Sequence, residues 1–343
     1  MTIPLLQTSQ KILVVKLAGI GDFVLALPAL KCLSAQSRGE VTLLCAERVR
    51  GLAERSPYFK EVLFFRESFF SLNTLLPNLK TLLFLRKKRF DLGINLHEIG
   101  SLRGSLMMGL LFLILCPRVS AGSNRTGEGF FFTHKIPDIR EDESPDMLKY
   151  LQWVALLGGE IPLSTIPELF ISKEDDIEVD RLLKEKGILS SRMIVGLQPG
   201  GNKKEFLWPI PHFAAVAQHL RKRYGASIVV TGDHREKELA ERLQGLVDFP
   251  IITLCGLLPL ERVPALLRRL HLFVSNDTGL AHLAGAVGTP LVSIFGPSSE
   301  KRFYPFLRDG KGLVIHRKDV SRISEISSQE VAQKIDQFLG GNG

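Results

Sequence analysis

The chain has 343 residues, which is long for one domain and ordinary for two, because single hydrophobic cores stop growing at roughly 250 to 300 residues. A hydrophobic fraction of 45% with 23% charged residues is typical of a globular protein and excludes a fibrous or largely disordered chain. The formal net charge is +8, and residues 1–120 alone hold 16 lysines and arginines against 8 acids.

The four cysteines lie far apart in apolar surroundings, and no pair has the spacing of a zinc or dithiol motif. They are Cys32, Cys45, Cys116 and Cys255. We expect them to be free core thiols in a reducing compartment. The first residues lack the basic start, apolar middle and cleavage site of a signal peptide, so we expect a cytoplasmic location.

Short apolar runs, each the length of a buried strand, alternate with helical stretches along the chain. They are residues 11–17, 41–46, 91–96, 193–199, 227–232, 251–256, 272–277 and 290–296. This alternation predicts an α/β fold built from βαβ units with parallel sheets. The pattern weakens between about 160 and 190, which predicts two Rossmann-like domains, residues 1–170 and 171–343. Residues 327–340 have helical periodicity and should form a terminal helix of the second domain.

Two stretches of the first half concern surfaces. The basic run RKKRF at 86–90 is typical of a solvated helix end, but a basic first half also suits an acidic ligand or an anionic membrane. No interleaved aromatic pattern accompanies it, so we expect no nucleic acid partner. The apolar run at 106–116 is shorter than the roughly 20 residues of a membrane span. We interpret it as a buried core helix, with a helix lying on a membrane surface as the alternative.

The first motif is VVKLAGIGDFVLALPAL at 14–30, an apolar strand followed by a Gly-rich turn and a helix. Such a turn usually binds an anion, because free N–H groups and the helix dipole favour negative charge. Asp22 would repel a phosphate there. An acid at this position can instead accept the proton of an attacking hydroxyl, or it can cap the helix.

The second motif is VGLQPGGNKKEFLWP at 195–209. Its glycines let backbone N–H groups approach a phosphate, and its lysines supply counter-charge. The candidate residues are Gly200, Gly201, Asn202, Lys203 and Lys204. The alternative is a plain turn between a strand and a helix.

The third motif is LFVSNDTGLAHLAGAVGTPLVSIFGPS at 272–298, where a strand ends and a helix of small residues begins. Thr278 and Gly279 can donate to a phosphate at the helix start, and Asp277 can accept from sugar hydroxyls. The alternative is that Asp277 or Thr278 only caps the helix. His282 can donate to a phosphate oxygen or be a satisfied core histidine.

The segment VVTGDHREKELAE at 229–241 again has a strand, a turn and a helix. Glu236 can accept from two ribose hydroxyls, or it is simply an acid in a first helical turn. Three turns of the second half therefore carry phosphate or sugar features. Because ligands of parallel sheets bind at the carboxyl ends of strands, we expect the nucleotide in the second domain, with Asp22 facing it across a cleft between the domains.

These motifs resemble those of glycosyltransferase family 9, the bacterial lipopolysaccharide heptosyltransferases. The likeness runs from about residue 11 to 335 and rests on the first and third motifs in this order, together with FDLGINLH at 90–97 and LQPGGNKKEFLWPIPHF at 197–213. The resemblance implies a GT-B fold and an inverting transfer of heptose from ADP-heptose to the Kdo and lipid A inner core. It implies no metal, and the sequence has no Asp-x-Asp triplet; we expect no cofactor.

The resemblance also implies roles for single residues. Asp22 would be the base, Glu236 would hold the ribose, and Asp277, Thr278, Gly279 and His282 would hold the diphosphate and sugar. The acceptor would be an anionic, lipid-linked glycan met at the cytoplasmic face of the inner membrane. Its carboxylates and phosphates suit the basic first half, in which Arg103 and Arg125 flank the apolar helix.

The sequence departs from the family pattern in two places. Phe206 stands where a lysine is common, so Lys203 or Lys204 would supply the counter-charge. The segment VIHRKDVSRISEIS at 314–327 lacks the usual cysteines. The open alternatives are a family member with another nucleotide sugar or another acceptor, such as a protein or capsule chain, and a binding protein without turnover.

Overall fold

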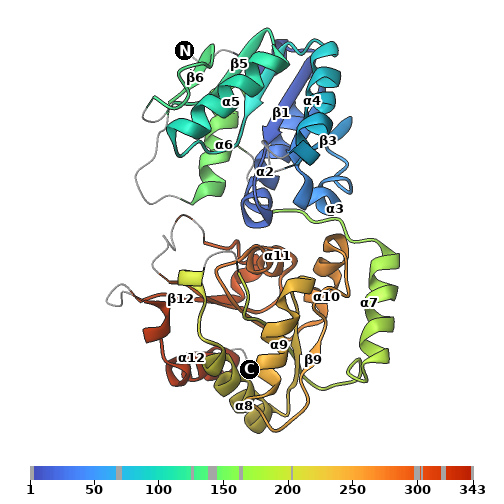
Figure 1. The fold of residues 1–343 in the computed structure, drawn as a ribbon, viewed down its shortest axis with the longest axis vertical. Coiled ribbons are helices and arrows are strands. Elements are labelled where there is room, and N and C mark those ends of the chain that lie inside the picture. Colours follow the sequence, from blue (N-terminus) through green and yellow to red (C-terminus); the bar gives the residue numbers. More distant parts are fainter. Residues whose placement is uncertain are drawn as a thin grey trace. The chain divides into compact units, whose positions relative to one another are not determined.

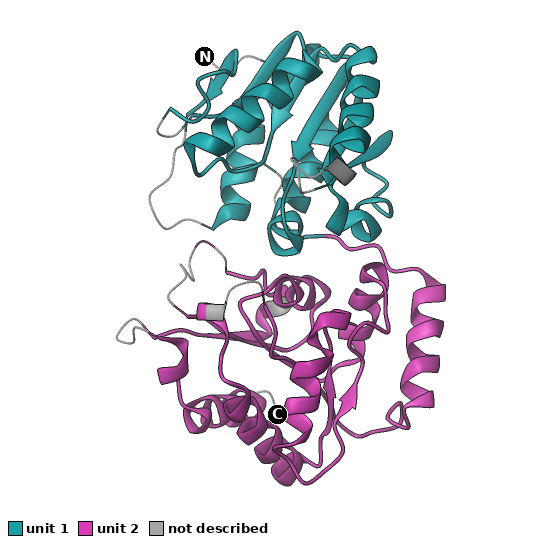
Figure 2. Ribbon diagram, in the orientation of Figure 1, with its two compact units in different colours: residues 1–167 teal, residues 168–343 magenta. Residues whose placement is uncertain are grey.

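The computed structural model describes residues 4–66, 72–124, 127–137, 145–161, 165–201, 204–296, 302, 304–317 and 322–340. The chain divides into two compact units, residues 1–167 and 168–343, called unit 1 and unit 2 below (Figure 2). The sequence places the boundary after residue 170, within a few residues of this division.

Unit 1 is a parallel sheet with the strand order β3-β2-β1-β4-β5-β6. Its strands are β1 (Lys11–Lys16), β2 (Glu40–Ala46), β3 (Glu61–Phe65), β4 (Leu92–Asn95), β5 (Val119–Ser123) and β6 (His134–Ile136). Its helices are α1 (Leu5–Thr8), α2 (Ile20–Gln36), α3 (Arg50–Ala53), α4 (Leu72–Lys87), α5 (Leu102–Leu115) and α6 (Asp146–Leu156) (Figure 1).

Helices cover both faces of this sheet, which is why its central strands are apolar throughout rather than alternating. Leu13 and Val15 of β1 share one buried cluster with side chains of α4 and α5. Ile12 and Val14 point to the opposite face and are also fully buried. On unit 1, α2 and α6 pack against each other.

Unit 2 is a second parallel sheet, with the order β12-β11-β10-β7-β8-β9. Its strands are β7 (Ile194–Gln198), β8 (Ser227–Val230), β9 (Ile252–Thr253), β10 (Leu272–Asn276), β11 (Leu291–Ile294) and β12 (Gly312–Ile315). Its helices are α7 (Lys173–Glu185), α8 (Ile210–Tyr224), α9 (Lys237–Gln244), α10 (Val263–Arg269), α11 (Gly279–Val287) and α12 (Ser328–Gly340).

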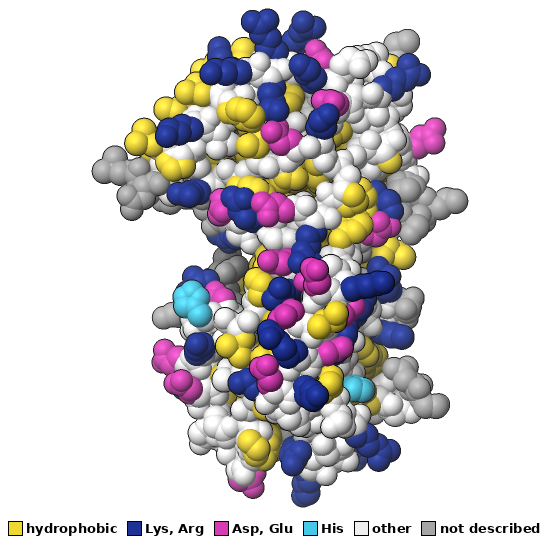
Figure 3. Space-filling view, turned by 90° about the vertical axis from the view of Figure 1, so that its right-hand side faces the viewer, with side chains coloured by type: hydrophobic (Ala, Val, Ile, Leu, Met, Phe, Trp, Pro, Cys, Tyr) yellow, Lys and Arg dark blue, Asp and Glu magenta, His cyan; other side chains and the backbone are white. Residues whose placement is uncertain are grey.

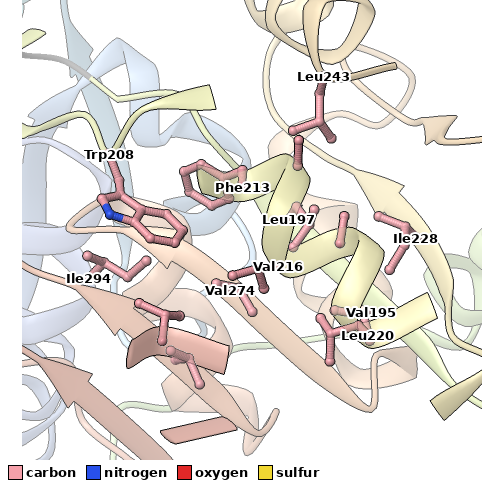
Figure 4. Close-up of a cluster of buried hydrophobic side chains, with 14 of the residues drawn as sticks. Val195, Leu197, Trp208, Phe213, Val216, Leu220, Ile228, Leu243, Val274 and Ile294 are labelled. Carbon is pink, nitrogen blue, oxygen red and sulfur yellow. The ribbon is translucent and has the colours of Figure 1, made fainter. Parts of the chain in front are cut away.

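The main core of unit 2 lies between α8 and the sheet. Figure 4 shows Trp208, Phe213, Val216 and Leu220 pointing toward strand residues such as Val274, and all of these are buried. Pro211 lies in the first turn of α8, and Gly225 ends the helix in the left-handed conformation at a φ of 65°; these are usual start and stop signals of a helix.

Both sheets have the same topology, since each starts from a central strand, adds two strands on one side and then crosses to the other side. The crossing point lies between β1 and β4 in unit 1, and between β7 and β10 in unit 2. Ligands of such sheets bind outside the carboxyl ends of the strands at this crossing point. The topology therefore predicts one candidate ligand site in each unit, at the carboxyl ends of β1 and β4 and of β7 and β10.

The structure contains all eight predicted strands, although residues 251–256 form a strand of two residues only. The terminal helix is present as α12. The sequence analysis missed β3, β5, β6 and β12, which are short and lie toward the sheet edges. β5 and β6 contain few large apolar residues, and most side chains of β3 and β12 are only half-buried.

Two predictions for the first half are wrong. The helix over 106–116 is not a buried core helix: α5 buries one side, but Leu106, Leu110 and Leu113 are exposed. Cys116, which follows α5, is exposed too, whereas the other three cysteines are buried as predicted. Within the described ranges, no helix is long and apolar enough to cross a membrane.

Candidate active site

A pocket of about 740 Å³ lies in unit 1 at the crossing point of its sheet. Gly19 follows β1 and His97 follows β4, and both line the pocket. Asp22 reaches it from the first turn of α2. Arg48 and Arg103 add two cations, while Phe65 and α5 side chains supply an apolar wall. The pocket therefore combines an acid, positive charge and apolar surface.

Asp22 does not serve as the cap of α2. The helix begins at Ile20 with Gly19 as its N-cap, and no side chain caps it. The carboxylate of Asp22 makes no hydrogen bond or ion pair with the residues that the structure describes. The capping alternative therefore loses its support, and the carboxylate is left to face the pocket.

Lys16, at the end of β1, places a cation near Asp22. Its ammonium is wholly buried and donates to Leu96 O at 3.1 Å and to the Tyr150 hydroxyl at 2.7 Å. Burial lowers the pKa of Lys16 to about 8, and the carboxylate of Asp22 opposes part of this fall. Burying a lysine charge costs free energy, which these two hydrogen bonds and the nearby carboxylates partly offset.

His97 and α6 complete the charged cluster around Lys16. Burial lowers the pKa of His97 to about 4, with the nearby Lys16 as the second cause, so the imidazole is neutral at physiological pH. Lys149 of α6 is buried and donates to Asp146 at 3.0 Å and to Glu98 at 3.3 Å. This network joins α6 to the segment after β4 that forms the pocket.

In unit 2, a chain of hydrogen bonds joins the ends of three neighbouring strands. Thr278 Oγ1 donates to Gln198 Oε1 at 2.6 Å, and Gln198 Nε2 donates to Glu236 Oε1 at 3.2 Å. Glu236 Oε2 accepts from the Asp233 N–H at 2.8 Å, and burial raises the pKa of Glu236. A Cβ on Gly200 would lie 1.3 Å from Glu236 Oε1, so a larger residue there would displace the Glu236 side chain.

Asn276, at the end of β10, holds the Gly-rich loop of unit 2. Its buried Nδ2 donates to Pro199 O at 2.9 Å and to Gly200 O at 3.1 Å, and its Oδ1 accepts from Trp208 N at 2.9 Å. Trp208 is itself fixed by its indole N–H, which donates to Ile326 O at 2.7 Å. One side chain thus fastens both ends of the loop between β7 and α8.

The structure brings several predicted donor residues together at this second crossing point. Gly200 and Gly201 follow β7, and Asp277, Thr278 and Gly279 follow β10. Thr278 is the N-cap of α11, but its hydroxyl bonds to Gln198 instead of capping the helix. His282 is 4% exposed, which agrees with its alternative as a core histidine.

Other predicted residues stay predictions. Asn202, Lys203 and Arg125 lie outside the described residues, and only the backbone of Lys204 is described. Glu236 forms a capping box with Asp233, as its structural alternative expects, while its contact with Gln198 also places it beside the Gly-rich loop. Arg103 is exposed and lines the pocket of unit 1.

Sequence analysis missed Lys16, Arg48, His97, Gln198 and Asn276. Lys16, Gln198 and Asn276 are polar residues in the last position of an apolar strand, and His97 lies two residues after β4. That placement is the available signal, because the carboxyl ends of parallel strands meet at one edge of the sheet. Arg48 follows β2 in a short 3₁₀ turn and carries no comparable signal.

Comparisons with known proteins identify the family and the fold. The family model described as glycosyltransferase family 9 (heptosyltransferase) matches residues 80–331. The lipopolysaccharide core heptosyltransferase OpsX of Haemophilus influenzae is 26% identical over 226 residues, which are 65% of this chain. The match spans 61% of OpsX, less than two thirds of its length.

Two solved structures have the same fold over nearly the whole chain. A family 9 glycosyltransferase from Veillonella parvula matches with a TM-score of 0.82 at 20% identity, covering 99% of this chain and 100% of that one. The ADP-heptose lipopolysaccharide heptosyltransferase II of Escherichia coli matches with a TM-score of 0.76 at 21% identity, covering 97% and 99%. The predicted GT-B fold of two Rossmann-like domains is confirmed.

Proposed function

The chain belongs to glycosyltransferase family 9, and from this we propose that it is an inverting, metal-independent transferase of heptose from ADP-heptose to the Kdo and lipid A inner core of lipopolysaccharide. The observation that carries the proposal is the pocket at the crossing point of unit 1. It presents the carboxylate of Asp22 without a hydrogen-bonded partner among the described residues. An ionised carboxylate without such a partner can accept a proton as a general base.

Unit 2 is the proposed donor domain. The ribose hydroxyls would donate to Glu236, and the diphosphate would accept from backbone N–H groups at the start of α11. Asn276 supports this role because it fixes the Gly-rich loop that would close on the phosphates. Lys203 or Lys204 remains the proposed counter-charge in place of the lysine that Phe206 replaces.

In the proposed reaction, the acceptor hydroxyl oxygen attacks the anomeric carbon of the donor heptose. Asp22 accepts the hydroxyl proton, and the bond from the anomeric carbon to the diphosphate oxygen breaks with its electron pair going to the leaving ADP. Lys16 places a positive charge near the Asp22 carboxylate. Attack opposite the leaving group inverts the configuration.

Unit 1 is the proposed acceptor domain. The guanidinium groups of Arg48 and Arg103 line the same pocket as Asp22, and guanidinium pairs well with carboxylate and phosphate. Kdo carboxylates and lipid A phosphates supply such anions, and Arg125 remains a further proposed contact. We place the protein in the cytoplasm with a peripheral contact at the inner membrane, where a lipid-linked acceptor would be met.

A donor and acceptor screen tests the proposal. The purified protein is incubated with ADP-heptose, other ADP-sugars, UDP-sugars and GDP-sugars, each with and without Kdo–lipid A, and released nucleotide is measured. We expect release only with ADP-heptose and the acceptor together. Release with another sugar or acceptor would replace the proposed substrate, and nucleotide-sugar binding without any release would instead favour a binding protein.

A further inference from the structure

The exposed sides of α4 and α5 form an apolar surface that the proposed reaction does not use. The described residues include eighteen exposed large hydrophobic side chains, and nine of them lie on these two helices. They are Leu75, Leu76, Leu79, Leu83 and Phe84 of α4, and Leu102, Leu106, Leu110 and Leu113 of α5. We call this set the α4–α5 face. Scattered exposed leucines are normal, but such a concentration marks an interaction site.

Both helices present this face on the same side of unit 1. Leu82 and Leu85 of α4 and Leu111 and Leu115 of α5 belong to one core cluster with β1, so the opposite sides of both helices point away from the sheet. On α5 the exposed leucines recur every three or four residues, which is one helix side. Arg86 joins the helices by donating to Leu113 O and Ile114 O of α5.

The chain segments that carry the face contain basic residues and no acids. Residues 72–90 hold five lysines and arginines and no acid, and residues 99–118 hold two arginines and no acid. Two of these basic residues form ion pairs with acids of neighbouring segments: Lys88 with Glu61 at 2.7 Å and Arg118 with Asp91 at 3.5 Å. Lys80 and Lys87 are exposed on α4 beside the leucines. Figure 3 shows hydrophobic side chains together with lysines and arginines on the surface of unit 1.

We propose that the α4–α5 face docks on an anionic lipid bilayer, with its leucines in the headgroup region and its lysines and arginines against lipid phosphates. Apolar side chains bordered by basic ones are the chemistry of interfacial membrane binding. A second copy of the chain fits less well, because a symmetric contact would bring the same positive charges together.

Helix α5 contributes both to the α4–α5 face and to the pocket of unit 1. The opposite flank of α5, through Arg103, Met107 and Leu111, lines the pocket that contains Asp22. A protein seated on lipid through the face would have the pocket beside the bilayer surface, within reach of a lipid-linked acceptor. This part of the inference rests on the proposed function, whereas docking itself does not.

Cys116 makes docking measurable with the natural sequence. It follows α5 and is exposed, while Cys32, Cys45 and Cys255 are buried. We would attach an environment-sensitive fluorophore to Cys116 and add vesicles of phosphatidylcholine alone or with 30% phosphatidylglycerol, without donor or acceptor. We expect a blue shift and co-flotation only with the anionic vesicles, both weakened by 1 M salt.

Variants distinguish specific binding through the α4–α5 face from non-specific adsorption of exposed apolar residues to lipid. The triple variant Leu106→Gln, Leu110→Gln and Leu113→Gln should bind anionic vesicles at least tenfold more weakly, and Lys80→Gln with Lys87→Gln roughly fivefold more weakly per charge. The matched control is Ile177→Gln, Leu189→Gln and Leu246→Gln, three exposed apolar residues of unit 2, which should bind like the parent.

Equal binding of the parent to both vesicle types, or undiminished binding of the α5 triple variant, would overturn the proposal. Sedimentation without lipid tests whether a second copy of the chain binds the face instead. A dimer that the α5 triple variant abolishes would show that the face is a contact between copies and would overturn the proposal. ADP titration is run in parallel. A protein that docks but binds no ADP would contradict the proposed function and leave docking intact.

Discussion

The neutral state of His97 makes unit 1 sensitive to acid. Its pKa falls from 6.5 to about 4 in the folded protein, chiefly because the ring is buried and secondly because Lys16 is near. The unfolded chain therefore binds a proton between these two values that the folded chain does not. The stability due to neutral His97 is fully present above pH 6.5 and is lost as pH falls toward 4.

The magnitude follows from the two pKa values. Between pH 7.5 and pH 5, linkage gives a loss of about 2 kcal/mol in the free energy of unfolding from this one group, as an upper value. The substitution His97→Asn removes the titrating group, and within the described part of the chain the imidazole of His97 makes no hydrogen bond that would be lost. The variant should therefore lose about 2 kcal/mol less than the parent over the same pH interval.

Urea unfolding at the two pH values measures this difference. Hydrogen exchange of peptides from β1 and β4 reports unit 1 separately from unit 2. The difference in free energy of unfolding between parent and variant at pH 7.5 gives the pH-independent cost of the substitution. This difference is subtracted from the one measured at pH 5. If parent and variant lose the same stability between pH 7.5 and 5, His97 titrates normally and the packing argument around Lys16 is refuted.

Three further substitutions test the site. Asp22→Asn should lower transfer by roughly a hundred- to ten-thousand-fold with an unchanged melting temperature and donor affinity, since Asn cannot accept the proton; near-normal turnover would remove Asp22 as the base. Gly200→Ala should displace Glu236 and weaken ADP binding at least tenfold in a calorimetric titration, whereas Gly340→Ala, with open space around it, should not. Lys16→Met should leave Leu96 O and the Tyr150 hydroxyl without their buried donor and lower the free energy of unfolding of unit 1 by about 1 to 3 kcal/mol in urea; an unchanged free energy of unfolding would contradict this structural role.

The sequence by itself determined the fold class and the location of both candidate sites. Short apolar runs such as 11–17 and 272–277 alternate with helical stretches and have the composition of strands buried on both faces, which is typical of the middle of a parallel sheet. Their length and spacing were therefore enough to predict the fold class. Glycine-rich turns directly after such strands also marked where ligands would lie, because the carboxyl ends of parallel strands share one edge.

Only the tertiary structure decided which polar residues meet. Lys16 contacts Tyr150 across more than a hundred residues of sequence, and Asn276 bonds to Pro199 and Trp208 from another strand. Local pattern carries no information about such partners. The exposure of α5 was decided in the same way, because its sequence is apolar on nearly every side and only the position of the sheet selects the side that is buried.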